Sequence, residues 1–200
     1  MKQAILIFSI LLISSCGNNS GYNELIELGE QAELNGNFQE AADHYKQAIK
    51  IDPSKPKPYS LLAGSIAQNC ADCGSDTVLT LLNKAYELDS LDELTIFNLA
   101  YVNGRILNNY GKSIDYYSKL IELTTNLDTI AMIKANRANM FMRSGDTSSY
   151  CSDLKAALEQ IEHEQLRNNY LIDCHEYIET DVSLKVLLDS NNRVDTIIQE

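Results

Sequence analysis

Basic side chains are scarce in this sequence. Its 200 residues include 16 Lys and Arg against 28 Asp and Glu, which gives a net charge of −12. A surface this acidic repels phosphate backbones, so the composition argues against a nucleic-acid partner. Beyond residue 13 no apolar run is long enough to cross a bilayer. The hydrophobic content of 44% nevertheless suits one domain with a buried core.

Catalytic signatures are also missing. The sequence has no Gly-x-Ser-x-Gly motif and no glycine-rich loop that would cradle a phosphate. Its histidines are His44, His163 and His175, all among charged or polar neighbours. The last two would form a metal site with nearby carboxylates only if their helices pack together, and solvated side chains explain them equally well. We therefore expect neither an enzyme nor a cofactor.

A helical pattern is what the sequence does contain, most clearly over residues 23–53. Apolar residues recur at helical spacing in two stretches, Leu25–Ala32 and Phe38–Ile49, with charged residues between them. Gly36 lies between the stretches, where the chain must turn, and Pro53 ends the second stretch. Two short amphipathic helices leave an apolar face in water, so this unit requires neighbours.

These residues resemble the tetratricopeptide repeat, a helix–turn–helix unit of about 34 residues. The positions that the family fills with large, small or aromatic residues and a final proline are occupied here by Leu25, Leu28, Gly29, Ala32, Gly36, Phe38, Ala41, Tyr45, Ala48 and Pro53. Nearly the whole motif is present. The resemblance implies a stack of helix pairs that binds other proteins.

Weaker copies of the unit follow along the chain. Ala48, Ala85, Leu120 and Ala157 are equivalent, at steps of 37, 35 and 37 residues. We predict repeats at 22–55, 56–92, 93–127 and 128–163, with a capping box at Ser90–Glu93 that opens the third. Residues 164–190 are expected to form a capping helix region, and 191–200 a frayed tail. The predicted fold is all-α, a right-handed α-solenoid of about four repeats.

Residues 1–15 have the features of an export signal. Lys2 precedes an apolar run over residues 4–13, which is short for a membrane span. The next residues, Ile13–Cys16, resemble the bacterial lipobox, which implies cleavage before Cys16 and attachment of acyl chains such as palmitate to it. Residues 16–21 would then be a flexible lipidated tether. We expect the protein at the bacterial outer membrane, facing the periplasm; an ordinary secretory leader is the alternative.

Four further cysteines allow three disulfide connectivities in an exported chain. We favour Cys70–Cys73, within a widened turn at 69–74, and Cys151–Cys174, between the fourth repeat and the capping helix. Thiol chemistry at Cys70 and Cys73 is the alternative, but such a motif normally follows a strand, and here it follows a helical pattern.

In the family that these repeats resemble, the first helices line a groove that holds an extended peptide or a helix. We expect the groove here at Ile26, Glu30, Glu33, Lys57, Ser60, Phe97, Tyr101, Arg105, Asn139 and Met142. Phe97 and Tyr101 either face this groove or pack between repeats. The family's clamp for a terminal carboxylate is missing, because its positions hold Ile26, Glu30, Leu61, Leu94 and Asn98.

The predicted function is that of a membrane-anchored scaffold or adaptor for an envelope protein or peptide that the sequence does not identify. Two alternatives remain open. One is a periplasmic thiol-redox or metal-binding protein that uses Cys70 and Cys73. The other is a structural lipoprotein with no peptide ligand.

Overall fold

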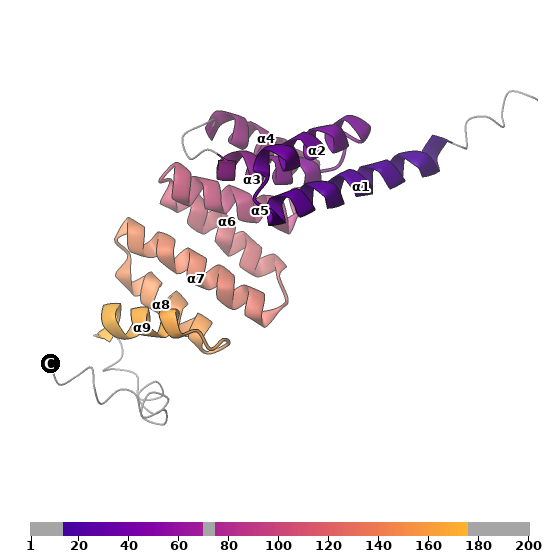
Figure 1. Cartoon of the computed structure of the whole chain (residues 1–200). Coiled ribbons are helices and arrows are strands. Elements are labelled where there is room, and N and C mark those ends of the chain that lie inside the picture. Colours follow the sequence, from indigo (N-terminus) through magenta and orange to yellow (C-terminus); the bar gives the residue numbers. More distant parts are fainter. Residues whose placement is uncertain (1–13, 70–74, 176–200) are drawn as a thin grey trace, which may run out of the picture. The chain divides into compact units, whose positions relative to one another are not determined.

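The computed structural model describes residues 14–69 and 75–175, and the regular elements in these ranges are helices (Figure 1). The chain divides into two compact units, Met1–Asn108 and Asn109–Glu200. The boundary falls inside the predicted third repeat, so its first helix belongs to one unit and its second helix to the other. Each unit is described by itself below.

The first unit contains two complete helix pairs and half of a third. Its elements are α1 (Ser14–Leu34), α2 (Phe38–Ile51), α3 (Lys57–Asn69), α4 (Ser75–Leu88), α5 (Glu93–Tyr101) and a π-helix, η1 (Val102–Ile106). Helix α2 packs against both α1 and α3, and α3 also packs against α4 and α5. Each apolar face is thereby covered by a neighbouring helix, as a repeat architecture requires.

The second unit contains α6 (Tyr110–Leu123), α7 (Leu127–Ser144), α8 (Thr147–Leu158) and α9 (Glu164–Asp173). Helix α7 packs against α6 and α8, and α9 packs against α8. Its core includes Ala138, Leu154 and Tyr170. Helix α9 lies within the region predicted to cap the last repeat.

The second helices of the pairs, α2, α4, α6 and α8, share one pattern of burial. The fourth, eighth and eleventh residues of each helix are all buried: Ala41, Tyr45 and Ala48; Val78, Leu82 and Ala85; Ser113, Tyr117 and Leu120; Tyr150, Leu154 and Ala157. Steps of four and three residues place these side chains on one face of a helix. The sequence alignment of the repeats is therefore confirmed at Ala48, Ala85, Leu120 and Ala157.

Two first helices end in the same way. Gly36 after α1 and Gly145 after α7 have φ angles of 76° and 84°, a conformation that glycine adopts without strain. The next amide closes each turn: Asn37 N donates to Ala32 O at 2.8 Å, and Asp146 N donates to Phe141 O at 2.9 Å. The turn predicted at Gly36 is confirmed.

The beginning of α1 differs from the sequence prediction. Helix α1 starts at Ser14, so residues 16–21, predicted to be a flexible tether, are helical. Near Gly21, α1 contacts the end of α2, since a side chain added at Gly21 would lie 3.7 Å from Ile51 Cδ1. Helix α1 thus begins before the predicted start at Tyr22, although glycine and asparagine are poor helix formers.

Two further predictions about first helices are wrong in detail. Leu28, placed in the core by the motif, is 45% exposed, whereas Ile26 is 5% exposed. The buried stripe of α1 runs through Ile26, Gly29 and Ala32, and Leu28 lies beside it. The helix cap before α5 is Asp92, whose carboxylate accepts a hydrogen bond from Thr95 N at 2.8 Å, and not the predicted Ser90–Glu93 box.

Candidate functional site

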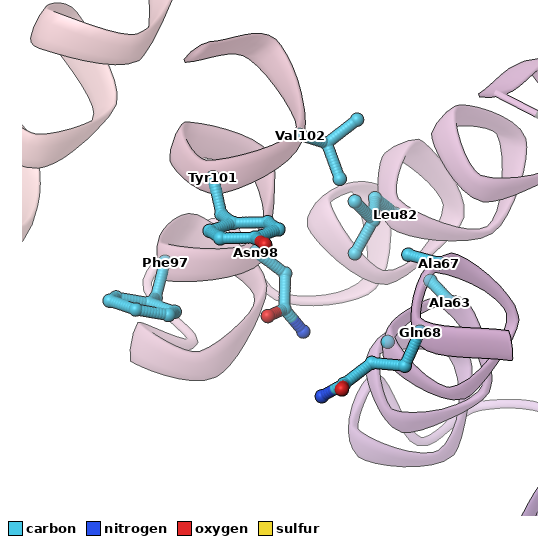
Figure 2. A pocket seen from close by; sticks show the side chains of 9 residues that line it. Ala63, Ala67, Gln68, Leu82, Phe97, Asn98, Tyr101 and Val102 are labelled. Atoms are coloured by element: carbon cyan, nitrogen blue, oxygen red, sulfur yellow. The ribbon is translucent and has the colours of Figure 1, made fainter. Parts of the chain in front are cut away.

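A hollow of about 430 Å³ lies between α3 and α5 in the first unit. Figure 2 shows side chains of the two helices facing each other across it. Its lining consists of Ala63, Gly64, Ala67, Gln68, Leu82, Phe97, Asn98, Tyr101 and Val102. None of these side chains carries a charge. This volume falls in the range of pockets that hold ligands.

Small residues on α3 create the space. Ala63, Gly64 and Ala67 face α5 with little or no side chain, and a Cβ added at Gly64 would meet no atom within 4 Å. Leu82 of α4 is fully buried beneath them. The pocket exists because the face of α3 that lies toward α5 carries small residues, and large side chains at these positions would fill the space.

The polar side of the pocket is held by a chain of hydrogen bonds between α3 and α5. Asn98 Nδ2 donates to Ser60 O at 3.1 Å, and Ser60 Oγ shares a hydrogen bond of 2.6 Å with Thr95 Oγ1. Ser60 and Thr95 are both 0% exposed. Ser60 was predicted to face the groove; it is instead a buried link that fixes the Asn98 amide.

The π-helix begins at the edge of the pocket. Leu107 N donates to Val102 O at 3.1 Å, a bond that spans five residues, and the buried Asn103 Nδ2 donates to Leu99 O at 2.8 Å. Short π-helical turns inside α-helices are frequent at functional sites. Here the turn follows Tyr101, which is 43% exposed, and carries the exposed Arg105.

Three predicted groove residues lie between α1 and α3. Glu30 pairs with Lys57 at 2.8 Å, and Glu33 accepts a hydrogen bond from Ser65 Oγ. Burial, together with the nearby charges of Glu33 and Glu30, raises the pKa of Tyr45. The two carboxylates of α1 thus form a partly paired acidic patch against α3, the helix that also borders the pocket.

The remaining predictions for the groove have mixed outcomes. Ile26 is buried, and its assignment to the groove is wrong for the reason given above. Phe97 and Tyr101 line the pocket. Asn139 and Met142 are exposed on α7, in the second unit, and their role in a groove stays a prediction. The sequence analysis did not identify Gln68, Leu82 or Val102, although the small residues around Gly64 were a signal for a gap.

The second unit is cross-linked near its C-terminal end. The sulfur atoms of Cys151 and Cys174 are joined at 1.97 Å, with the pairing favoured from the sequence. Beside them the Tyr150 hydroxyl donates to Asp173 Oδ2 at 2.7 Å. Burial, and then this hydrogen bond, raises the pKa of Tyr150. Cys70 and Cys73 lie outside the described residues.

The histidines do not assemble a metal site in the described parts of the chain. No group of three or more His, Cys, Asp or Glu side chains there could hold a metal ion. His163 instead caps α9, since its Nδ1 accepts a hydrogen bond from Leu166 N at 3.3 Å. His163 and His175 lie at opposite ends of α9, so the structure does not bring them together. Cys16 lies in the first turn of α1.

Comparison with known proteins supports the repeat assignment. The TPR repeat family matches residues 34–68. No curated protein sequence matches the chain. A solved structure described as PilF of Pseudomonas aeruginosa is similar, with a TM-score of 0.72 and 15% identity over 82% of this chain and 72% of that one. A structure of PilW, described as a type IV pilus biogenesis factor, gives a TM-score of 0.62 and 17% identity over 69% and 61%. A structure of MamA has a TM-score of 0.60 and 18% identity, over 72% of this chain and 80% of that one.

The family match over residues 34–68 identifies a tetratricopeptide repeat there, and the chain has the all-α fold of tetratricopeptide-like repeats. This fold implies a scaffold for protein–protein interaction. Among the helices in the described ranges, none is both long and apolar enough to cross a membrane.

Proposed function

We propose that the protein is an adaptor of the bacterial cell envelope, which holds a partner protein through the pocket between α3 and α5. The observation that carries the proposal is this pocket, which is lined by two successive first helices and is uncharged in an otherwise acidic chain. A pocket with a few oriented polar groups on an apolar lining is the usual form of a binding site.

The envelope location rests on two arguments of different kinds. Residues 4–16 combine an apolar run with a motif that resembles a lipobox. Two of the similar structures, PilF and PilW, are related to the chain by fold, and PilW is described as a type IV pilus biogenesis factor. We take the second argument as support for an assembly role in the envelope, without carrying over a particular partner.

A lipid on Cys16 would act through α1. Because residues 16–22 are helical and a helix rises about 1.5 Å per residue, Cys16 would lie roughly 9 Å along the axis from Tyr22. Several acyl chains, at about 0.8 kcal/mol for each buried CH₂, would hold the protein on the membrane. The first repeat would then work close to the lipid surface.

In-cell photo-crosslinking from Tyr101 tests the adaptor function. A photoreactive residue at Tyr101 should capture one dominant envelope protein, identified by mass spectrometry. The same residue at Gln47, which is exposed on α2, is the matched control. Capture of the same set of proteins from both positions would show that the pocket is not a specific binding site.

The substitution Cys16→Ser tests the anchor. The variant should move from the membrane fraction to the soluble fraction, while Cys151→Ser, which alters a cysteine in the second unit, should stay with the membrane. If Cys16→Ser remains in the membrane fraction, lipidation at Cys16 is wrong.

A further inference from the structure

The chemistry of the pocket between α3 and α5 defines the part of a partner that it accepts. This inference rests on the proposed adaptor function and adds the nature of the ligand. Ala63, Leu82 and Val102 are each at most 2% exposed and form the apolar part of the lining. A charged side chain inserted here would lose its water and find no opposite charge among the lining residues. The pocket is therefore suited to an aliphatic or aromatic side chain.

The mouth of the pocket offers one oriented acceptor. One N–H of Asn98 Nδ2 donates to Ser60 O, and this bond orients the amide so that its oxygen can accept a hydrogen bond from a ligand. In Figure 2 the amides of Asn98 and Gln68 extend into the space between the two helices. The Ser60–Thr95 hydrogen bond beneath Asn98 is buried, so the amide is held before a ligand arrives. Such an acceptor matches the backbone N–H of an extended peptide.

The surroundings of the pocket are acidic. Helix α3 also contacts Glu30 through Lys57 and Glu33 through Ser65, and the whole chain has a net charge of −12. Lys57 compensates the charge of Glu30, whereas the hydrogen bond that Glu33 accepts from α3 comes from the neutral Ser65. A peptide that crosses α3 thus meets uncompensated negative charge beside the uncharged pocket. Electrostatic complementarity favours a basic residue in the flank of the ligand and disfavours an acidic one.

We propose that the pocket between α3 and α5 binds an extended peptide segment of a partner protein, which inserts one aliphatic or aromatic side chain and places a basic residue toward Glu33. The uncharged pocket selects an apolar residue at the position of the peptide that inserts, which we call the anchor. Glu33 selects a basic residue over an acidic one at a neighbouring position, which we call the flank.

The test uses fluorescein-labelled nine-residue peptides and the purified chain, with binding read by fluorescence anisotropy. The central residue is Leu, Phe, Lys or Asp, and the flanking positions are serine with a single Lys or Glu. We expect Leu and Phe peptides with a Lys flank to bind, and replacement of the central residue by Asp to weaken binding about tenfold or more. Replacement of the flanking Lys by Glu should weaken binding to a smaller degree.

Two variants locate the binding. Gly64→Leu should abolish the preference for an apolar anchor, because its side chain enters the pocket where a Cβ meets no other atom. Gly111→Leu is the control, since Gly111 on α6 also has no neighbour within 4 Å of such a Cβ and lies in the other unit. Circular dichroism of both variants should match the parent. Glu33→Gln should remove the flank preference and leave the anchor preference in place.

The outcomes separate this inference from the function on which it rests. Equal binding of Lys-centred and Leu-centred peptides, or an unchanged affinity in Gly64→Leu, would overturn the pocket inference while Tyr101 crosslinking could still support an adaptor. Absence of binding by every peptide overturns the proposed ligand chemistry. If Tyr101 also captures no specific partner, the adaptor function is overturned as well.

Discussion

The first and fourth repeats have equivalent turns but are held together by different contacts. Measured from the turn glycines Gly36 and Gly145, Gly29 and Tyr45 of the first repeat correspond to Ala138 and Leu154 of the fourth. A Cβ at Gly29 would lie 2.3 Å from Tyr45 Cε1, so the aromatic ring occupies the space of a missing side chain. Ala138 and Leu154 are both buried in the core of the second unit. In the first repeat the gap between the two helices is thus filled by Tyr45 of the second helix alone. In the fourth repeat Ala138 of the first helix and Leu154 of the second helix fill it together.

The comparison extends to the positions just before these residues. In the fourth repeat Arg137 donates from Nε and Nη2 to the two carboxylate oxygens of Asp153, each at 2.7 Å, and from Nη1 to Ser118 Oγ at 2.8 Å. The corresponding residues of the first repeat are Leu28, which is 45% exposed, and His44, whose Nδ1 is buried without a hydrogen-bond partner.

This comparison shows that the apolar pattern of the repeat determines which helix faces pack together. The polar contacts and cross-links that stabilise this packing differ between the two repeats. The TPR family match covers residues 34–68, which include Tyr45 but not Gly29. The fourth repeat keeps the geometry with an ion pair and a disulfide, neither of which belongs to the motif.

The largest expected effect comes from Arg137→Ala. Its partner Asp153 is 9% exposed in its side chain, and the loss of Arg137 would leave that carboxylate buried without its cation. We expect the free energy of unfolding to fall by about 3–5 kcal/mol, measured by urea denaturation. The exposed Lys46–Asp43 pair provides the control, and Lys46→Ala should change stability little. A loss for Arg137→Ala no larger than that of the control would mean that the ion pair does not support the second unit.

Removal of the disulfide should have the next largest effect. The double substitution Cys151→Ala and Cys174→Ala opens a loop with a sequence separation of 23 and is expected to cost about 3 kcal/mol in the chain-entropy description. Chemical reduction of the parent protein should reproduce the change, and the reduced parent and the double variant should then unfold at the same urea concentration. No difference between oxidised and reduced parent would contradict the prediction.

Exchange of the paired small residues tests the packing comparison itself. Gly29→Ala should destabilise the first unit by about 1–3 kcal/mol, because Tyr45 has to move away from the new methyl group. Gly64→Ala, on α3, adds the same methyl group in open space and should stabilise by about 0.5–1 kcal/mol through helix propensity alone. Thermal denaturation of the two variants should therefore show shifts of opposite sign. Shifts of the same sign would mean that Tyr45 does not require glycine at position 29.

The smallest expected effect is a pH dependence at the start of α8. Hydrogen bonds from Ser149 lower the pKa of Asp146, so its charged form is favoured in the folded state. Its contribution is present above the ordinary pKa of aspartate and is lost as the pH falls through the lowered value. Asp146→Ala should lower Tm at about pH 7, and this difference should shrink at about pH 2. Asp115→Ala, in an exposed position of α6, should show no pH-dependent difference in Tm from the parent. If Asp146→Ala lowers Tm equally at both pH values, the charge of Asp146 does not stabilise the start of α8.

The second helices and the glycine turns could be predicted from the sequence because their signals are local. A period of three and four residues and a glycine at a helix end suffice to place Tyr45 and Gly36. The faces of the first helices could not be assigned as well, since Ile26 and Leu28 are both apolar and only packing against α2 distinguishes them. Ser60 looked like a surface residue because its partner, Thr95, lies 35 residues away.

The candidate site was predictable only in part for the same reason. Phe97 and Tyr101 were found as apolar residues at helical spacing on a first helix. The pocket itself depends on the lack of large side chains on the part of α3 that faces these two residues. It also depends on Leu82, which belongs to a third helix, α4. A periodicity argument treats each helix separately and does not reveal such a space.

The π-helix has a consequence for how the chain tolerates insertions. The segment Glu93–Ile106 comprises 9 residues of α5 and 5 of η1. A π-helical turn accepts one residue more than an α-helical turn, and the step from Ala85 to Leu120 is 35 residues, one more than the family length of about 34. An added residue can thus be accommodated inside a helix, with no change in loop length and with the buried positions of α6 still in register. Alignments of this chain that allow gaps only in turns will misplace the residues that follow Tyr101.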